Sequence, residues 1–164
     1  MPQQIGFDLA AGNYNLFIGN ANEWTTTIKL TGIIPARSSF LITSDADMNA
    51  TPSATLPAAD ITASFELGNS GFKIALMSGL ETLTVVNPFT EIDGSLKDHY
   101  IYLLGTTVAN AFETTAAAQS RPQGPRRVLI PGAEVLTDSN NNFVDFKQSD
   151  FARLSGCRRR YAGR

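Results

Sequence analysis

The stretch Phe65–Met77, which reads Phe-Glu-Leu-Gly-Asn-Ser-Gly-Phe-Lys-Ile-Ala-Leu-Met, is the part of the chain that decides its fold. Large apolar side chains alternate with other residues on both sides of the block Gly68–Gly71. Alternation with a period of two is typical of a strand with one buried face, and a Gly/Asn/Ser block favours a tight turn. The stretch therefore predicts two strands, Phe65–Leu67 and Phe72–Met77, joined as a hairpin.

Further strands are predicted wherever apolar or β-branched runs are bounded by Gly, Asn or Pro. They lie at Tyr14–Ile18, Thr25–Leu30, Ser38–Thr43, Glu81–Val86, His99–Leu104 and Arg126–Ile130. Ser38–Thr43 is apolar on both faces, so we expect it at the centre of a sheet. Ala109–Gln119 has a helix-compatible composition without an apolar stripe. We interpret Ser44–Ala63 as a long surface excursion and Asp138–Phe146 as a polar turn.

Short strands separated by turn signals, without a long helical pattern, predict an all-β fold. We expect an antiparallel β-sandwich of about seven to nine strands. With 164 residues, one domain is the default. We expect the sandwich to span residues 1–152. Residues 153–164 are predicted to form a basic tail or linker, because they hold five of the thirteen basic residues.

The bulk composition narrows the class of protein. A net charge of −2 gives no general attraction to nucleic acid or to a membrane surface. No apolar run reaches the length of a membrane span, and the first residues lack the pattern of a secretory signal. Charged residues make up 17% of the chain, and Thr, Ser, Ala, Gly and Asn take their place. This composition suits the polar, uncharged surface of an extracellular β-rich protein.

Catalytic chemistry has little support in the sequence. The chain has one histidine, His99, and one cysteine, Cys157, and it lacks a Gly-x-Ser-x-Gly elbow. One His and one Cys do not furnish a zinc site, and no nucleotide-binding glycine loop is present. We therefore predict that the chain is not an enzyme. A hydrolase with a hidden site would need carboxylates such as Asp45, Asp47 and Asp93 to converge.

The sharpest chemical pattern is a run of acidic and amide side chains near the C-terminus. Asp and Asn at every second position can present oxygens to calcium from one side of a turn. The candidate calcium ligands are Asp138, Asn140, Asn142 and Asp145. The run departs from a calcium loop at Phe143 and Ser149, where Gly and Glu are expected. The alternative is an Asx-turn, in which these side chains cap their own backbone.

Two features are candidates for partner binding. Trp24 follows a polar turn and is a candidate platform for a sugar or anchor for a protein. The arginines of the tail, Arg158, Arg159 and Arg160, are candidates for contact with phosphate groups. The alternatives are core packing for the tryptophan and a solvated linker for the arginines.

Four segments, in order, resemble lamin-tail domains. Their family patterns are I-P-A-G-x-Y-x-L-I, F-x-L-S-N-S-G-D-x-V-x-L, V-D-x-V-x-Y and R-R…D-T-D-N-N-x-x-D-F. The matching residues are Ile34–Ile42, Phe65–Leu76, Asp98–Leu103, and Arg126–Arg127 with Thr137–Asn142 and Asp145–Phe146. Phe72 and Ser139 stand where the family has Asp, and the second departure weakens a metal-binding role.

The resemblance implies an immunoglobulin-like sandwich. It also implies an accessory module of a larger secreted or cell-surface protein, as in bacterial relatives, which contacts a protein or a glycan. The alternative is a nucleic-acid-binding module that uses the arginine-rich tail, since lamin-tail domains of nuclear lamins contact DNA. Pairing of exposed edge strands would give a homo-oligomer. We expect no cofactor, apart from the calcium named above, and no membrane insertion.

Overall fold

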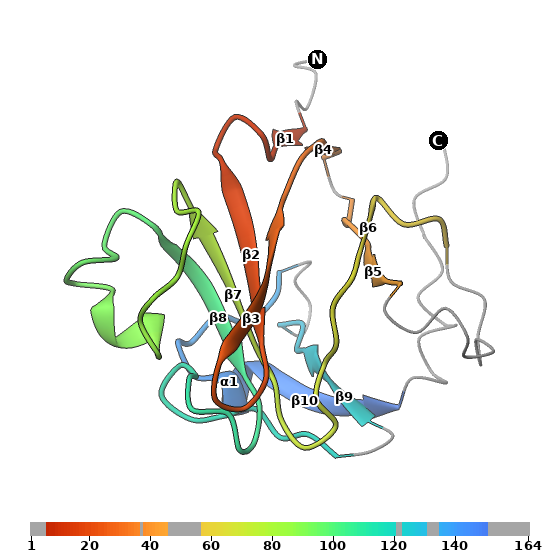
Figure 1. Ribbon diagram of the computed structural model, residues 1–164. Helices are drawn as coiled ribbons and strands as arrows, with labels where there is room; N and C mark the ends of the chain where they lie inside the picture. Colours follow the sequence, from red (N-terminus) through yellow and green to blue (C-terminus); the bar gives the residue numbers. More distant parts are fainter. Residues whose placement is uncertain (1–5, 37, 46–56, 121–122, 131–134, 151–164) are drawn as a thin grey trace.

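The computed structural model describes residues 6–36, 38–45, 57–120, 123–130 and 135–150. Within these ranges the chain forms ten strands, one short α-helix and one 3-10 helix (Figure 1). The all-β prediction is therefore confirmed. No helix among the described residues is long and apolar enough to cross a membrane. The predicted boundary between residues 152 and 153 lies outside the described residues.

A four-stranded antiparallel sheet forms the centre of the molecule, in the order β3-β2-β7-β8. Its strands are β2 (Tyr14–Gly19), β3 (Trp24–Lys29), β7 (Lys73–Ser78) and β8 (Tyr100–Gly105). Strand β7 lies between β2 and β8, and Leu76 pairs with Leu16 on one side and with Tyr102 on the other. Strands β3 and β8 are the two edges of this sheet.

Both faces of the sheet are covered. On one face Phe17, Ala75, Met77 and Leu103 form a buried cluster, which is completed by residues from irregular segments such as Leu83. On the other face a second cluster joins the sheet to residues of the outer strands. It includes Leu16, Ile18, Ile28, Ile42, Ile61, Phe65, Ile74 and Leu76. Burial of apolar surface on both faces stabilises the stacked arrangement.

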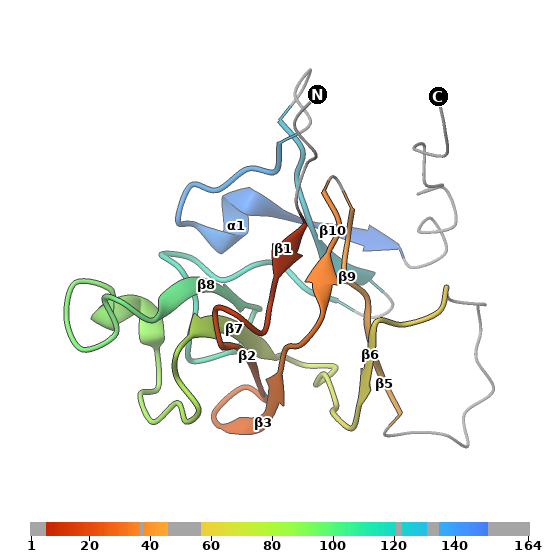
Figure 2. The same ribbon diagram turned by 90° about the horizontal axis from the view of Figure 1, so that it is seen from above.

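The outer strands form three separate pairs (Figures 1 and 2). They are β1 (Phe7–Asp8) with β4 (Ile33–Ile34), β5 (Ile42–Ser44) with β6 (Ile61–Ala63), and β9 (Gln123–Arg127) with β10 (Phe146–Asp150). The β5–β6 pair is parallel, and the other two are antiparallel. The remaining elements are η1 (Pro88–Glu91) and α1 (Asn142–Asp145).

The predicted hairpin around Gly68–Gly71 is wrong. Residues 65–67 form no strand, because both neighbours of β7 are already taken by β2 and β8. Phe65 instead packs in the cluster shared with β5 and β6, whereas Phe72 begins the approach to β7. The Gly-rich block therefore carries the chain from an outer pair into the central sheet.

Two other predicted strands differ from the structure. Strand β5 covers just the end of Ser38–Thr43 and pairs with β6, so it is not a central strand. Glu81–Val86 forms no strand, although Leu83 is buried and Val85 packs against the same cluster. The side chains of this segment cover the sheet, but its backbone does not pair with any strand.

The C-terminal half also departs from its prediction. Ala109–Gln119 is irregular rather than helical, and Thr114 has a positive φ of 51°. Strand β9 starts three residues before the predicted Arg126–Ile130 and includes Pro125. The expected polar turn contains helix α1 and leads directly into β10. Strand β6 occupies the end of the predicted excursion Ser44–Ala63, and residues 46–56 lie outside the described ranges.

Candidate functional site

Two buried polar side chains, those of Glu113 and Asn142, lie at the outer edge of β8. Thr106 N–H donates to Phe72 C=O across the β7–β8 pair at 3.0 Å. In an antiparallel pair the backbone groups of alternate residues point to opposite sides. Those of Leu103 and Gly105 therefore point outward, away from β7, where unpaired groups would attract another strand.

All four of these outward groups are hydrogen-bonded. Leu103 N–H donates to Glu113 Oε1 at 3.2 Å, and Leu103 C=O accepts from Asn142 Nδ2 at 2.8 Å. Gly105 N–H donates to Asn142 Oδ1 at 2.8 Å, and Gly105 C=O accepts from Ala117 N–H at 2.8 Å. One carboxylate, one side-chain amide and one backbone amide thus take the place of a fifth strand.

Glu113 and Asn142 are also hydrogen-bonded to each other. Asn142 N–H donates to Glu113 C=O at 3.1 Å, and Glu113 N–H donates to Asn142 Oδ1 at 3.2 Å. Asn142 Nδ2 donates its second hydrogen to Glu113 Oε2 at 3.0 Å. Gly105 allows Ala111 and Phe112 to lie close to β8, because a Cβ atom at Gly105 would lie 1.7 Å from Ala111 O. Asn142 is fully buried, and its amide has its complete set of partners.

The carboxylate of Glu113 is 1% exposed and accepts a further hydrogen bond from the Tyr100 hydroxyl. Burial is the main cause that raises the pKa of Glu113, and the nearby Asp138 and Asp145 carboxylates add to it. The hydrogen bonds from Tyr100 and Leu103 act in the opposite direction. Burial and the bond to Glu113 raise the pKa of Tyr100, so this phenol stays protonated and donates.

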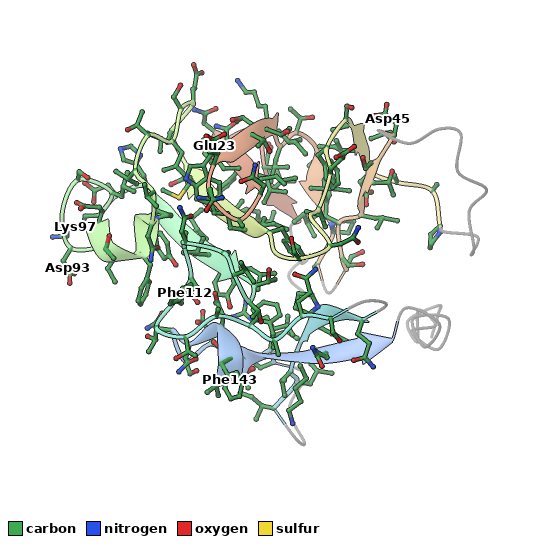
Figure 3. The ribbon with its side chains drawn as sticks, turned by 60° about the horizontal axis from the view of Figure 1, so that its bottom comes forward. Glu23, Asp45, Asp93, Lys97, Phe112 and Phe143 are labelled. Carbon is green, nitrogen blue, oxygen red and sulfur yellow. The ribbon has the colours of Figure 1, made fainter. Side chains whose placement is uncertain are left out.

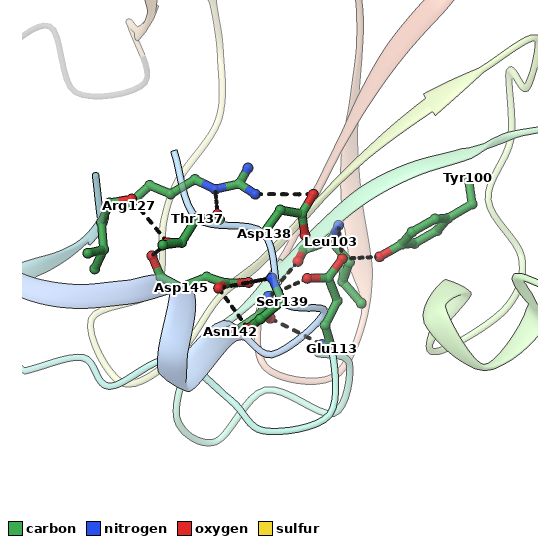
Figure 4. A network of polar contacts seen from close by, with 10 residues as sticks. Tyr100, Leu103, Glu113, Arg127, Thr137, Asp138, Ser139, Asn142 and Asp145 are labelled. Carbon is green, nitrogen blue, oxygen red and sulfur yellow. Dashed lines mark hydrogen bonds and ion pairs between the residues drawn. The ribbon is translucent and has the colours of Figure 1, made fainter. Parts of the chain in front are cut away.

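Asp138 and Asp145 lie beside Glu113, and one oxygen from each of the three carboxylates lies within 4.8 Å of the others (Figure 4). Asp145 is fully buried and accepts from Ser139 N–H at 2.9 Å and from Ser139 Oγ at 2.8 Å. Asp138 is exposed and pairs with Arg127 Nη2 at 3.3 Å. Three carboxylates at such distances are of a kind that can hold a divalent cation.

Arg127 joins this cluster to the central sheet. Its guanidinium lies 4.1 Å from the centre of the Tyr102 ring on β8, and its Nε donates to Thr137 C=O at 2.7 Å. Burial raises the pKa of Tyr102, with Glu113 as the next cause, whereas Arg127 lowers it. The guanidinium of Arg127, stacked on the Tyr102 ring, therefore attaches the β9–β10 pair to the central sheet.

The four predicted calcium ligands have different surroundings in the structure. Asn142 accepts N–H groups of the protein at both lone-pair positions of its Oδ1, and its role as a calcium ligand stays a prediction. Asp138 and Asp145 do converge, together with Glu113, which the sequence pattern did not single out. Asn140 has a φ of 55°, and its C=O accepts from Thr114 Oγ1 at 2.7 Å. Asn141, which is not one of the four candidates, caps helix α1 by accepting from Phe143 N–H.

Trp24 lies in a second polar site, on the other edge strand. Its indole N–H donates to Val85 C=O at 2.9 Å, and the ring packs against the core cluster. Lys73 Nζ lies 4.4 Å from the ring centre and donates to Asn110 Oδ1 at 2.7 Å and to Asn22 C=O at 3.2 Å. Core contacts thus account for Trp24, and its role in partner binding stays a prediction. Burial lowers the pKa of Lys73, and Glu23 partly offsets this effect.

The carboxylates expected for a hidden hydrolase do not gather in the described part of the chain. Asp45 and Asp93 lie on opposite sides of the molecule (Figure 3). His99 Nδ1 lies 2.8 Å from Ser78 C=O, which is a structural contact next to a turn. Asp47, Cys157 and the arginines Arg158, Arg159 and Arg160 lie outside the described residues.

A hollow of about 610 Å³ lies where β7 and β8 meet the start of β9. Its lining combines apolar and amide or hydroxyl side chains, and none of the described lining residues is charged. They are Leu67, Asn69, Phe72, Ile74, Leu104, Gln119, Ser120, Gln123, Gly124 and Pro125. A hollow of this size and composition is suited to binding rather than to acid–base chemistry.

No protein-family model matches the chain, and no curated protein or solved structure was found to be similar to it. The resemblance to lamin-tail domains therefore rests on its four sequence motifs.

Proposed function

We propose that this chain is a non-catalytic β-sandwich module of the lamin-tail kind, with an immunoglobulin-like fold. In this proposal it belongs to a larger secreted or cell-surface protein and contacts a protein or a glycan. The observation that supports this proposal best is the use of the buried charged groups. Glu113 closes the edge of β8, Asp145 holds a turn, and Lys73 ties two loops to Trp24.

A catalytic group has to reach a substrate with a free lone pair or proton. The oxygens of Glu113 and Asp145 accept hydrogen bonds from neighbouring residues, and both side chains are 1% exposed or less. The hollow, in contrast, is open to a ligand and has an uncharged lining. We therefore assign partner contact to the hollow and a structural role to the buried charges.

The test is a nuclear magnetic resonance titration of the whole chain with soluble oligosaccharides and with short uncharged peptides. We expect one class to shift the amide signals of the hollow. Leu67→Arg should abolish this response, because Leu67 lines the hollow and is 42% exposed. The matched control is Val86→Arg, a substitution at a side chain that is 55% exposed and not among the lining residues.

Two results would overturn the proposal. The first is a hydrolytic activity of the isolated chain that is lost on substitution of Glu113 or Asp145. The second is binding of DNA that weakens steeply with salt and disappears on removal of residues 158–160, with no response in the hollow. The second result would establish the nucleic-acid-binding alternative.

A further inference from the structure

The hollow to which partner contact is assigned has a largely aliphatic wall. Five of its ten described lining residues are apolar, namely Leu67, Phe72, Ile74, Leu104 and Pro125. Leu67 is exposed, and Ile74 and Leu104 are half-buried, so part of this apolar surface is in contact with water. An apolar group that enters the hollow removes this surface from water, which favours binding.

The hollow offers little to a sugar ring. A sugar packs its C–H groups on the flat face of an exposed aromatic ring, and Phe72 is the one aromatic residue among the described lining residues. Phe72 is 5% exposed, so little of its ring is accessible. Trp24, the candidate platform for a sugar, packs against the core cluster and is not among the described lining residues.

Gln119, which lines the hollow, has one polar atom without a partner. Its Nε2 donates to Gly68 C=O at 3.1 Å and to Asn69 C=O at 3.4 Å. Its Oε1 is buried and accepts no hydrogen bond from the described residues. Because an unpaired buried acceptor is unfavourable, a ligand that brings an N–H group to Gln119 gains the missing hydrogen bond.

We infer that the hollow takes an apolar side chain of a partner peptide, and that a backbone N–H of the peptide donates to Gln119 Oε1. A peptide carries an aliphatic side chain and an N–H group on neighbouring atoms, whereas a sugar has no aliphatic side chain. None of the described lining residues is charged, so a charged side chain would be buried here without a partner, at a high cost. The inference rests on the proposed function and selects a protein, rather than a glycan, as the partner.

The first test compares small probes on the full chain. The probes are the capped peptides acetyl-Gly-X-Gly-amide, with leucine, alanine or aspartate at X, and the sugar chitotriose. Binding is measured by nuclear magnetic resonance from the amide signals of Asn69, Gln119 and Gly124, which line the hollow. We expect the leucine probe to shift these signals and the alanine probe to bind about tenfold to a hundredfold more weakly. The aspartate probe and chitotriose should leave the signals unchanged.

The second test concerns the hydrogen bond to Gln119. A methyl group is placed in turn on the backbone nitrogen of the leucine and on that of the glycine that follows it. One of the two should weaken binding by about threefold to tenfold, because it removes the N–H that Gln119 Oε1 accepts. In Gln119→Met, which keeps the length of the side chain but lacks the acceptor, this methyl group should have no effect. Thermal unfolding verifies that the variant folds.

Each failure has its own signature. A response of the hollow to chitotriose and not to the leucine probe would overturn this inference and leave the proposed function standing. Equal binding of the leucine and aspartate probes would also overturn the inference alone. No response of the hollow to any probe would overturn both. The same loss on methylation in wild type and in Gln119→Met would refute the hydrogen bond to Gln119.

Discussion

At the scale of single residues, the side chain of Asn142 uses two hydrogens and two lone-pair positions within the protein. Its partners are the backbone of Leu103, Gly105 and Glu113 and the carboxylate of Glu113. A buried amide of this kind is tolerated because each of its donors and acceptors is hydrogen-bonded. Removing one partner leaves a buried polar group unpaired, which lowers the free energy of unfolding.

Replacing Asn142 by Asp should therefore be strongly destabilising. The change keeps the shape but turns two donors into acceptors, which face Leu103 C=O and the Glu113 carboxylate. We expect the free energy of unfolding to fall by about 3–5 kcal/mol, measured by urea denaturation at neutral pH. The control is Asn140→Asp, at an exposed position with a positive φ that both residues accept. Equal stability of the two variants would contradict the assigned role.

Glu113 should make the folded state less stable as the pH rises. Its pKa is raised in the folded protein, mainly by burial, so the native state binds a proton more readily than the unfolded chain. Between the ordinary pKa of glutamic acid and the raised one, the free energy of unfolding contributed by this group falls with increasing pH. Below the ordinary pKa both states are protonated, and the contribution no longer changes.

The measurement is a series of urea midpoints from mildly acidic to neutral pH, for wild type and for Glu113→Gln. The amide keeps an acceptor for Leu103 and Tyr100 but meets the donor of Asn142, so the variant is less stable in acid. The pH dependence of wild type minus that of the variant isolates Glu113 from the other carboxylates. A stability difference that rises toward neutral pH would refute the upward shift of the Glu113 pKa.

At the scale of elements, β7 shows how a charged residue can occupy the inner face of a strand. Lys73 is fully buried, and its ammonium group contacts Trp24, Asn22 and Asn110. These contacts connect the turn before β3 with the loop after β8. Lysine is buried at a cost unless it is paired in this way.

Replacing Lys73 by Met should leave the fold intact and loosen these two loops. The loss of hydrogen bonds and of the cation–π contact is expected to lower the free energy of unfolding by about 1–2 kcal/mol. Hydrogen exchange should accelerate at Asn110, whose N–H donates to Ala21 C=O. The control is Lys97→Met at an exposed lysine. If the Asn110 amide exchanged at the same rate in the Lys73 variant as in wild type, Lys73 would not hold the two loops together.

The sequence pattern located β2, β3, β7 and β8 well, because each is a continuous run with β-branched or aromatic residues. It did not show that both faces of β7 are covered. Ile74 and Leu76 looked like the buried side, but Ala75, Met77 and even Lys73 are more completely buried. With both faces of the sheet covered, alternation no longer distinguishes inside from outside.

The closing of the β8 edge was not predictable from local pattern. Glu113 lies in a segment rich in Ala and Thr, and Asn142 lies in a run that resembles a calcium loop. Their roles depend on contacts 10 and 37 residues apart in sequence, from Glu113 to Leu103 and from Asn142 to Gly105. Such pairings follow from the topology, which single-sequence patterns do not determine. The predicted strands Phe65–Leu67 and Glu81–Val86 failed for the same reason, since strand pairing and not propensity decides whether a segment becomes a strand.

At the scale of the whole molecule, the three clustered carboxylates bear on whether calcium stabilises the fold. The oxygens of Glu113 and Asp145 already accept protein donors, and Arg127 neutralises Asp138. We therefore expect the melting temperature to be the same with excess calcium and with a chelator. A rise with calcium that is lost in Asp138→Asn, but kept in Asp93→Asn, would show that the cluster binds the ion.

The central claim is that side chains close one edge of the sheet while the other edge stays open. Native-state hydrogen exchange of the dilute protein measures both edges at once. We predict that the amides of Leu103 and Gly105 are protected as well as that of Leu76 in the middle of the sheet, and that those of Thr27 and Lys29 exchange quickly. Rapid exchange at Leu103 and Gly105, at the rate of Thr27, would contradict the account.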